Sequence, residues 1–423
     1  MPEAEGVLLT GCTVVDCVVP GERFQEAAVL VRDKLIEAVD AAGALEERVR
    51  RGAHGPVRTV RLHGAYVLPA LWDAHVHLGD VVPPHVAAYA DEPPGAHMVR
   101  CVRKAQDNLR AGITSVRSLG ERFDHDIVLR DAIASGVLAG PRILASGDVA
   151  WSAAAVGPEQ FRREVRRMAR LGVDQVKLLG SGGIPTRSGG GIATPFIGRD
   201  ELSASCEEAA RWNLPVVLHA MGDDTISLGI EFGVRSIEHA FAMSPAIVKA
   251  LSASRTALCP NLVVTESWDP AWMEAARLPE WMVRNAAEAR RHHHAAVREA
   301  IAAGVTILAG ADDLPQPDGP VGIEQSAGRI GLVRELELLV SLGMRREEAL
   351  IAATRNPARV TGRDDDLGTV EAGKLADLLV VAGDPLADLR VLEHPVQVWK
   401  GGELVFTGAW QEARDSARSI RGA

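Results

Sequence analysis

The sequence has few cysteines, few lysines and no long uninterrupted apolar segment. Its five cysteines are odd in number and none form a CxxC pair (positions 12, 17, 101, 206 and 259). This pattern excludes a disulfide framework and indicates reduced thiols in a cytoplasm. No apolar run approaches the roughly 20 residues of a membrane-spanning helix. The acidic start, residues 1–5, lacks the basic region of a signal peptide. We therefore expect a cytoplasmic protein with no membrane contact.

An excess of positive charge is also missing. The chain has 46 Lys and Arg residues against 56 Asp and Glu residues, which gives a formal net charge of -10. A nucleic-acid-binding protein would instead show a basic patch or stripe, so we expect no nucleic-acid partner. Lysine is scarce and occurs only at positions 34, 104, 177, 249, 374 and 400. A lysine inside an apolar strand therefore calls for an explanation.

The length of 423 residues, 47% of them hydrophobic, fits one large α/β barrel with a smaller domain. Residues 1–65 hold short β-like pieces separated by Gly-containing turns, and we assign them to the first part of a small β domain. Residues 361–423 contain similar short β-like pieces, and we assign them to the second part of the small β domain. The two terminal segments are expected to form one β-sandwich, with residues 66–360 as the barrel between them.

The segment 66–360 alternates between strand-like and helix-like patterns. Helices are expected at 157–171, 199–213, 245–254 and 285–303, with Asp200 and Ser244 as N-caps of the second and third. The alternation is typical of a (β/α)8 TIM barrel. The expected strands are 67–78, 113–119, 142–146, 173–179, 215–219, 236–239, 256–262 and 306–311.

Polar residues stand at the C-terminal ends of the expected strands, where TIM barrels carry their chemistry. They are His75, His77, Lys177, His219, His239 and Asp312. Residues i and i+2 of a strand point to one face, so His75 and His77 should project together. Each residue alone has an ordinary explanation, such as a satisfied core histidine, a lysine reaching the surface or a helix-capping aspartate. Because all of them lie at strand ends, we predict a metal site, to which imidazole ligands are suited.

Lys177 requires a separate argument, because an ammonium group cannot bind a cation. Two metal ions a few Å apart need an anionic bridge, and the fourth strand end offers no Asp or Glu. Addition of carbon dioxide to the neutral amine would turn Lys177 into a carbamate, which is a bidentate anion. We infer this modification as a hypothesis.

With these residues in place, the chain resembles the amidohydrolase superfamily over nearly its whole length. The motifs that carry the resemblance are His-x-His (75–77), Val-Lys-Leu-Leu-Gly-Ser-Gly-Gly (176–183), His219, Ile-Glu-His (237–239), Gly-Ala-Asp (310–312), Asn-Pro-Ala (356–358) and Gly-Lys-Leu-Ala-Asp (373–377). The lysine followed by Ser-Gly-Gly looks most like the prolidase-like branch, related to imidazolonepropionase.

The resemblance implies a site with two divalent metal ions, usually zinc. His75, His77 and Asp312 would hold one ion, and His219 and His239 the other. A carboxylated Lys177 and a hydroxide would bridge the two ions. The chain departs from the family where Arg-Asp-Leu-Gly is often found, because it has Arg-Ser-Leu-Gly (117–120). It also has His-Ala-Met (219–221) in place of the frequent His-Ala-His. Both departures could reshape the pocket, so the resemblance alone does not fix the substrate. Many relatives form homo-oligomers, which we also expect here.

Bound metals lower the pKa of water towards about 7, so the resemblance implies a metal-bridging hydroxide that attacks a carbonyl. Asp312 could take the proton and pass it to the leaving amine. No Gly-x-Ser-x-Gly nucleophile motif is present. The leading hypothesis is hydrolysis of the amide bond in a small peptide-like molecule, namely an N-acyl amino acid or a dipeptide. Alternatives are a lactone, carbamate or organophosphate hydrolase, a cyclic-amide hydrolase or deaminase, and a non-catalytic scaffold.

Two segments are expected to shape the substrate site. The loop 181–191 is either a mobile connector or a substrate-binding loop, with Ser181, Gly182 and Arg187 as contacts. The segment 263–285 contains Trp268 and Trp272 and is either an apolar lid or a packed surface helix. In the run His292–His294, at most one ring should face the barrel. Arg117 and His125 could lie behind the metal ligands.

Overall fold

The computed structural model describes residues 6–80, 91–187, 191–268, 270–275, 277–312 and 331–409. Packing divides the chain into two compact units. The first unit contains residues Met1–Trp72, Asp107–Ser115 and Arg345–Ala423, and the second contains Asp73–Gln106 and Val116–Met344. Each unit therefore combines segments that are distant in the sequence.

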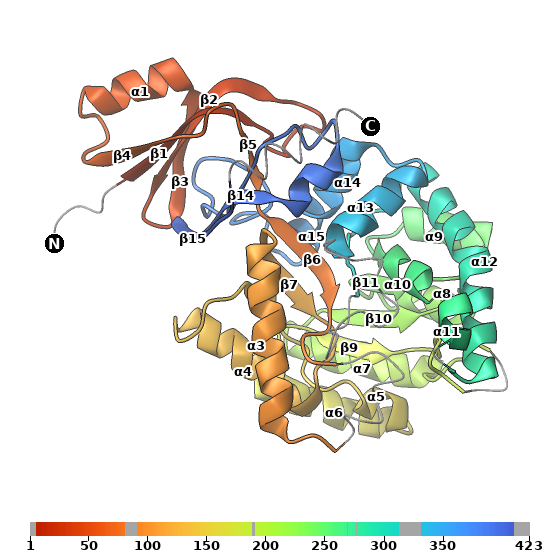
Figure 1. The fold of residues 1–423 in the computed structure, drawn as a ribbon. Helices are drawn as coiled ribbons and strands as arrows, with labels where there is room; N and C mark the ends of the chain where they lie inside the picture. Colours follow the sequence, from red (N-terminus) through yellow and green to blue (C-terminus); the bar gives the residue numbers. More distant parts are fainter. Residues whose placement is uncertain are drawn as a thin grey trace. The chain divides into compact units, whose positions relative to one another are not determined.

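The first unit is built on an eight-stranded sheet in which both terminal segments take part (Figure 1). Its path runs β15-β14-β13-β5-β1-β2-β3, and β4 pairs with β1 beside it. The antiparallel pairing of β5 with β13 joins the N-terminal strands to the C-terminal ones. The strands are β1 (Gly6–Val14), β2 (Phe24–Arg32), β3 (Leu35–Ala41), β4 (Val57–Arg61), β5 (Tyr66–Pro69), β13 (Leu378–Val381), β14 (Pro395–Lys400) and β15 (Glu403–Thr407).

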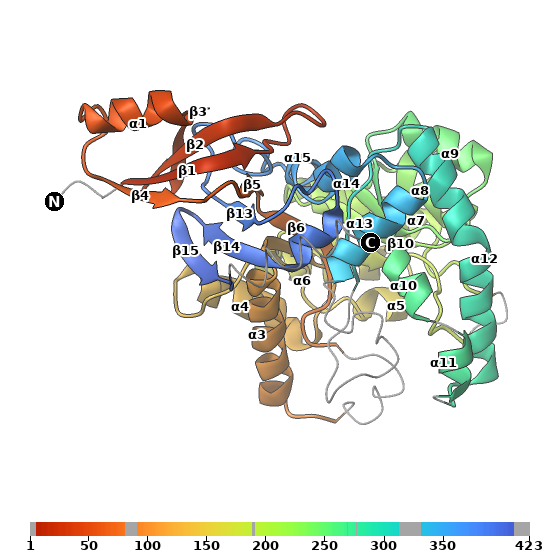
Figure 2. The ribbon, with the colours of Figure 1, turned by 45° about the horizontal axis from the view of Figure 1, so that its top comes forward.

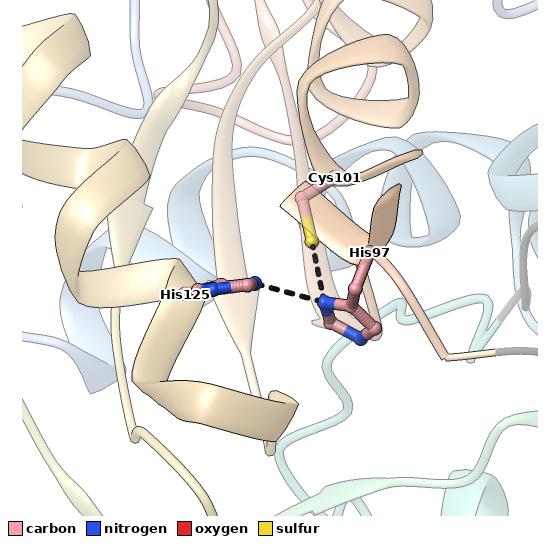
Figure 3. Close-up of side chains that lie close together, drawn as sticks. All are labelled: His97, Cys101 and His125. Atoms are coloured by element: carbon pink, nitrogen blue, oxygen red, sulfur yellow. Dashed lines mark hydrogen bonds between the residues drawn. The ribbon is translucent and has the colours of Figure 1, made fainter. Parts of the chain in front are cut away.

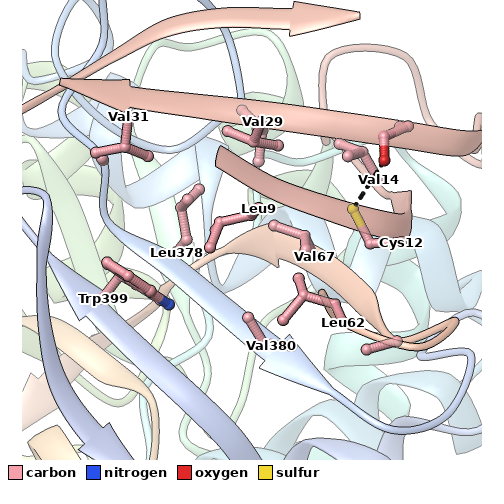
Figure 4. Packing of buried hydrophobic residues seen from close by; sticks show 14 of the residues in the cluster. Leu9, Cys12, Val14, Val29, Val31, Leu62, Val67, Leu378, Val380 and Trp399 are labelled. Carbon is pink, nitrogen blue, oxygen red and sulfur yellow. Dashed lines mark hydrogen bonds between the residues drawn. The ribbon is translucent and has the colours of Figure 1, made fainter. Parts of the chain in front are cut away.

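Alternation along these strands fills a core on each face of the sheet. Leu9 and Val29 point into a large apolar cluster that also receives Leu378 and Trp399 (Figure 4). The strands β2 and β13 are not neighbours in the sheet, and both contribute to this cluster. On the other face, Leu8, Ala28 and Leu30 pack with Leu45 of helix α1 (Ala42–Arg50). Helices α14 (Arg346–Ala352), α15 (Arg355–Val360) and η3 (Leu389–Glu393) complete the described elements of this unit.

The barrel strands form two parallel groups, β6-β7-β8 and β9-β10-β11-β12. Backbone hydrogen bonds join the groups, because Asp174 N donates to Ala145 O at 2.9 Å, Leu308 N to Leu258 O at 2.8 Å and Ala74 N to Ala309 O at 2.9 Å. The ring is thereby closed, and the fold is of the TIM-barrel type, as predicted. The strands are β6 (Leu71–Val76), β7 (Ile113–Ser118), β8 (Arg142–Leu144), β9 (Val176–Leu179), β10 (Val216–Ala220), β11 (Ser236–His239) and β12 (Ala257–Cys259).

Two expected strands differ from the structure. The segment 67–78 is broken at Ala70 into β5 and β6, because β5 pairs with the small sheet while β6 enters the barrel. The eighth expected strand, 306–311, forms only an isolated bridge between Leu258 and Ile307. The domain limits at 65/66 and 360/361 stay a prediction, since packing places residues 66–72 and 345–360 with the small sheet without defining a folding domain.

Helices lie along the outside of the barrel strands (Figures 1 and 2). The described helices are α3 (Pro94–Arg110), η1 (Arg122–Asp124), α4 (His125–Ala134), α5 (Trp151–Ala154), α6 (Pro158–Leu171), α7 (Arg199–Arg211), α8 (Asp223–Glu231), α9 (Pro245–Ser252), α10 (Leu262–Ser267), α11 (Pro270–Ala275), α12 (Glu280–Ala302) and α13 (Gly331–Ser341). Ser244 caps α9 as predicted, since its Oγ accepts from Ile247 N at 3.4 Å. The Asp200 cap is wrong, because α7 begins at Arg199 and Gly198, two residues before Asp200, holds the N-cap position.

Candidate metal centre

The structure brings the predicted histidines together at the C-terminal ends of β6, β10 and β11. Their rings form a continuous row, with centroid distances of 5.4 Å from His77 to His75, 5.1 Å from His75 to His239 and 4.6 Å from His239 to His219. Asp312 lies beside this row. Its Oδ1 is 3.4 Å from His77 Nε2 and 3.6 Å from His75 Nε2, and its Oδ2 is 3.9 Å from His239 Nδ1. Parts of the chain that are distant in sequence thus supply one cluster of ligand atoms.

The hydrogen bonds of the first two rings leave one nitrogen of each available. His75 Nδ1 lies 2.8 Å from Glu238 Oε2, and His77 Nδ1 lies 2.8 Å from the carbonyl oxygen of Gly120. These oxygens can only accept, so each Nδ1 carries the proton and each Nε2 presents a lone pair towards Asp312. A carboxylate or carbonyl behind a histidine is the usual support of a metal ligand.

His239 gives an independent indication of a bound cation. Its Nδ1 is buried and has no hydrogen-bond partner among the described residues. An unsatisfied buried nitrogen is unfavourable by about 1–3 kcal/mol, and a metal ion at the centre of the cluster would remove that penalty. The residues present therefore fit a metal site.

Burial keeps most of these rings neutral, which is the form that binds metal. Desolvation holds the pKa of His75 and His239 well below the usual value. It also lowers the pKa of His219 to about 3, and Lys177 contributes to that shift. For His77, burial lowers the pKa, but the carboxylates of Asp312 and Asp80 outweigh this effect and raise it.

Lys177 is 3% exposed and stands in β9 opposite Val217 of β10. Burial lowers the pKa of its amine to about 8, although the charges of Glu238 and Asp312 act in the opposite direction. Among the described residues, no carboxylate forms an ion pair with it. The neutral amine is the form that reacts with carbon dioxide, so the low pKa favours carbamate formation at neutral pH.

A buried charge network supports His75 from behind, and the sequence analysis did not identify its centre. Glu238 is fully buried, and its Oε1 accepts from Arg117 Nη2 at 2.7 Å and from Ser236 Oγ at 2.5 Å. Arg117 also donates through Nε to Ala74 O at 2.7 Å. Arg117 thus lies behind His75 on the side of Glu238, whereas the role of His75 as a metal ligand stays a prediction. In the described part of the chain, His125 contacts His97 and none of the residues of the histidine row.

Strand alternation alone would place Glu238 and His239 on opposite faces. Both nevertheless lie at the cluster, because His239 has a left-handed backbone with φ of 73° that returns its ring to the row. Asp312 also adopts a positive φ, 50°. Positive φ values are uncommon for non-glycine residues, and such residues cluster at functional sites. In the sequence, the only indication of a role for Glu238 was its position directly before His239.

The loop after β9 lies at the metal cluster. The carbonyl oxygen of Gly182 is 2.9 Å from His219 Nε2. Ser181 is buried, and its Oγ accepts from Met221 N at 2.9 Å. Asn285 of α12 donates to the carbonyl oxygens of Ile184 and Thr186 at 3.2 and 3.0 Å. The described part of the loop is therefore anchored on both sides, and sequence reasoning had missed the anchor at α12.

The remaining expected substrate residues differ in their surroundings. Arg187 is exposed at the end of the described part of this loop, and residues 188–190 lie outside the described residues. Trp268 is 8% exposed and belongs to an apolar cluster with Ile184, Met221 and Phe241. Trp272 belongs to α11, but its side chain lies outside the described part. In the His292–His294 run, the ring of His293 is buried and packs on Phe241 at 4.7 Å.

No helix among the described residues combines the length and apolar character that crossing a membrane requires. Residues 66–405 match the model of the amidohydrolase family. The chain is 28% identical to ochratoxinase of Aspergillus niger over 437 aligned positions, which cover 93% of this chain and 86% of that protein.

Solved structures give the same result. A Xaa-Pro dipeptidase with bound methionine superposes with a TM-score of 0.84 at 26% identity, covering 96% of this chain and 100% of the other. A prolidase in complex with N-methylphosphonate-L-proline superposes with a TM-score of 0.80 at 26% identity, covering 95% and 100% of the two chains. The chain therefore belongs to the amidohydrolase family and is a metal-dependent hydrolase that acts on amide bonds of small molecules.

Proposed function

We propose that this hydrolase uses two divalent metal ions, most suitably Zn2+, to cleave a peptide-like amide bond in a dipeptide or an N-acyl amino acid. The observation that carries the proposal is the row of four histidine rings with Asp312 beside it, completed by a buried lysine. His75, His77 and Asp312 would hold one ion. His219 and His239 would hold the second, and a carboxylated Lys177 would bridge the two.

Ions bound there would supply Lewis acidity, lowering the pKa of a water molecule towards about 7 and polarising a substrate carbonyl. The chain's own residues would handle the proton. Asp312 lies within 4 Å of three of the histidines, so its carboxylate is placed to accept a proton at this centre. Asp312 would then return that proton to the leaving amine. Glu238 would hold His75 in one tautomer throughout.

The choice of a peptide-like substrate is supported by the relatives. The two solved structures described above are a Xaa-Pro dipeptidase and a prolidase with an N-methylphosphonate-L-proline ligand. The surroundings of the site are compatible with such a molecule. The apolar cluster containing Trp268 reaches the site through Phe241, whose ring lies 5.6 Å from that of His239. It would receive the acyl group, while Arg187 would pair with the carboxylate.

A cytoplasmic location and a homo-oligomeric assembly stay predictions. The five cysteines are unpaired in the structure, which agrees with the expectation of a reducing compartment. Sedimentation of the purified chain would test the assembly.

Metal content tests the proposed centre. Elemental analysis of protein grown with zinc should give at least two ions per chain for the wild type, and Lys177→Ala should lose one ion together with activity. Lys249→Ala, on the exposed surface of α9, is the matched control and should change neither. About one ion per chain at this centre, unchanged in Lys177→Ala, would instead mean that Lys177 is structural and would support the mononuclear, deaminase-like alternative.

The substrate class requires a separate measurement. Release of amino acid from Xaa-Pro dipeptides and N-acyl amino acids should exceed hydrolysis of lactones, carbamates and organophosphates under the same conditions. Arg187→Ala should raise KM for substrates with a free carboxylate and leave their amidated counterparts unaffected. Equal turnover of lactones and amides would contradict the proposed specificity.

A further inference from the structure

A second group of metal-binding side chains lies away from the histidine row. His97 and Cys101 are four residues apart on α3, so they share one face of the helix. His125 begins α4 and points at the same position (Figure 3). His97 and Cys101 are fully buried, and His125 is 9% exposed. Two imidazole nitrogens and a thiol sulfur thus converge inside the barrel unit.

The distances between these atoms match those of a zinc site. His97 Nδ1 lies 3.0 Å from His125 Nδ1 and 3.5 Å from Cys101 Sγ. Around a tetrahedral zinc ion with ordinary bond lengths, neighbouring ligand nitrogens are about 3.3 Å apart, and nitrogen and sulfur are about 3.6 Å apart. All three atoms lie within 4.8 Å of one another. Small adjustments would therefore place an ion at bonding distance from all three.

Hydrogen bonding alone does not satisfy this arrangement well. The Nδ1 atom of His97 has a single direction for a proton or lone pair, yet both Cys101 and His125 approach it. A proton at His97 Nδ1 can form a hydrogen bond with only one of these two neighbours. The other neighbour is then left without a well-placed partner. A cation placed between the three atoms would satisfy them simultaneously.

The opposite edge of His97 meets acidic groups. Its Nε2 lies 3.1 Å from Glu121 Oε1 and 3.6 Å from Asp80 Oδ1. His97 Nε2 makes no aligned hydrogen bond to these groups, but their negative charge favours a proton on Nε2. A proton there leaves the Nδ1 lone pair facing Cys101 and His125, as in metal-bound histidines with a carboxylate behind them. A divalent ion with one thiolate carries one net positive charge, and the carboxylate of Glu121 would balance it.

We propose that His97, Cys101 and His125 form a structural site for a zinc-like cation, distinct from the catalytic centre. Two imidazoles and one thiolate are ligands that favour zinc. No described residue supplies a fourth ligand atom to this group, so a water molecule would complete the tetrahedron. Binding would release the thiol proton of Cys101 to solvent together with any proton held on His97 Nδ1.

The site would stabilise the segment that follows the catalytic ligand His77. Glu121 accepts hydrogen bonds from Leu78 N at 2.5 Å and from Gly79 N at 3.1 Å. The backbone of Gly79 also packs against the cluster, since a Cβ atom there would lie 2.5 Å from Cys101 Sγ. An ion that holds α3 and α4 together would therefore also hold this loop in place.

Without a metal, the same residues would form a buried ion pair. Burial lowers the pKa of His97, but Asp80 and Glu121 outweigh that effect and raise it to about 9. A protonated His97 would then donate to His125 and bind no cation. The two arrangements predict different metal contents and different spectra.

Cobalt distinguishes them, because a thiolate bound to Co2+ gives a strong ultraviolet charge-transfer band that imidazole and carboxylate ligands do not give. The full chain would be expressed in minimal medium with cobalt, so that buried sites fill during folding. We expect this band in the wild type and its loss, with about one metal ion fewer per chain, in Cys101→Ser. Cys259→Ser is the matched control, because Cys259 is also buried and lies beside His75 and Glu238.

The band should persist in Cys259→Ser. Loss in that variant with retention in Cys101→Ser would overturn the proposal, as would a wild-type protein with no band. If Cys101→Ser does not fold, His125→Asn provides a second test, because it should shift or remove the band while leaving the thiol intact. Lys177→Ala should retain the band, so failure of the catalytic-centre proposal and failure of this one remain distinguishable.

Discussion

Replacement of Glu238 by glutamine tests whether the network behind His75 holds that proposed metal ligand in place. The carboxylate uses both oxygens as acceptors, Oε2 towards His75 and Oε1 towards Arg117 and Ser236. A glutamine side chain has only one acceptor oxygen. In Glu238→Gln, the amide must therefore present its NH2 group either to His75 or to the guanidinium of Arg117.

Either orientation is unfavourable. If the amide oxygen faces Arg117, its NH2 group donates to His75, which moves the ring proton to Nε2 and removes the lone pair that faces the metal. If the oxygen faces His75, an NH2 group meets the buried cation. Arg117 is 1% exposed and loses its anionic partner in both cases. Breaking a buried ion pair typically costs about 3–5 kcal/mol of stability.

Two measurements follow from this argument. The urea midpoint of Glu238→Gln should fall by an amount equivalent to about 3–5 kcal/mol. Its zinc affinity, measured by competition with a chelator, should fall about 10- to 100-fold. Glu207→Gln, which breaks the exposed pair with Arg162, is the control and should leave the zinc affinity unchanged. Wild-type stability and zinc affinity in Glu238→Gln would refute the reasoning.

Three further predictions address the proton acceptor, the packing at the centre and the pH dependence of stability. Asp312→Asn should keep the thermal midpoint of the wild type while kcat falls about 10²- to 10⁴-fold, and full activity would exclude this residue as the base. Gly310→Ala should lower the zinc content by elemental analysis, because the added Cβ would lie 2.6 Å from Cys259 Sγ and 2.8 Å from His75 N. Burial raises the pKa of Glu335 to about 8 from 4.5, so the folded chain retains a proton that the unfolded chain releases, and this contribution to stability is present below pH 4.5 and is lost by about pH 8. Glu335→Gln cannot ionise and should remove this part of the decline in urea titrations at several pH values, whereas parallel curves for the two proteins would contradict the assignment.

Much of the fold could be predicted because it depends on local patterns. The pattern of residues 157–171 predicted a helix, and the structure confirms it as α6, which buries Phe161, Val165 and Met168. The N-cap of α9 was correct for the same reason. The absence of a regular strand at 306–311 could not be predicted, because the segment has the apolar pattern of an ordinary strand. Its hydrogen bonds depend instead on β6 and β12, which come from elsewhere in the chain.

The sequence by itself determined which residues stand at the ends of the barrel strands. This follows because strand spacing and barrel topology place His75, His77, His219, His239 and Asp312 at one rim wherever the strands form. Only the tertiary structure decided which atoms of these residues face one another. The tautomer of His75 depends on Glu238, which is 163 residues away, and the position of the His239 ring depends on a left-handed backbone. Contacts between distant segments and a strained backbone dihedral do not produce a periodic pattern in the sequence. They are therefore determined by tertiary packing.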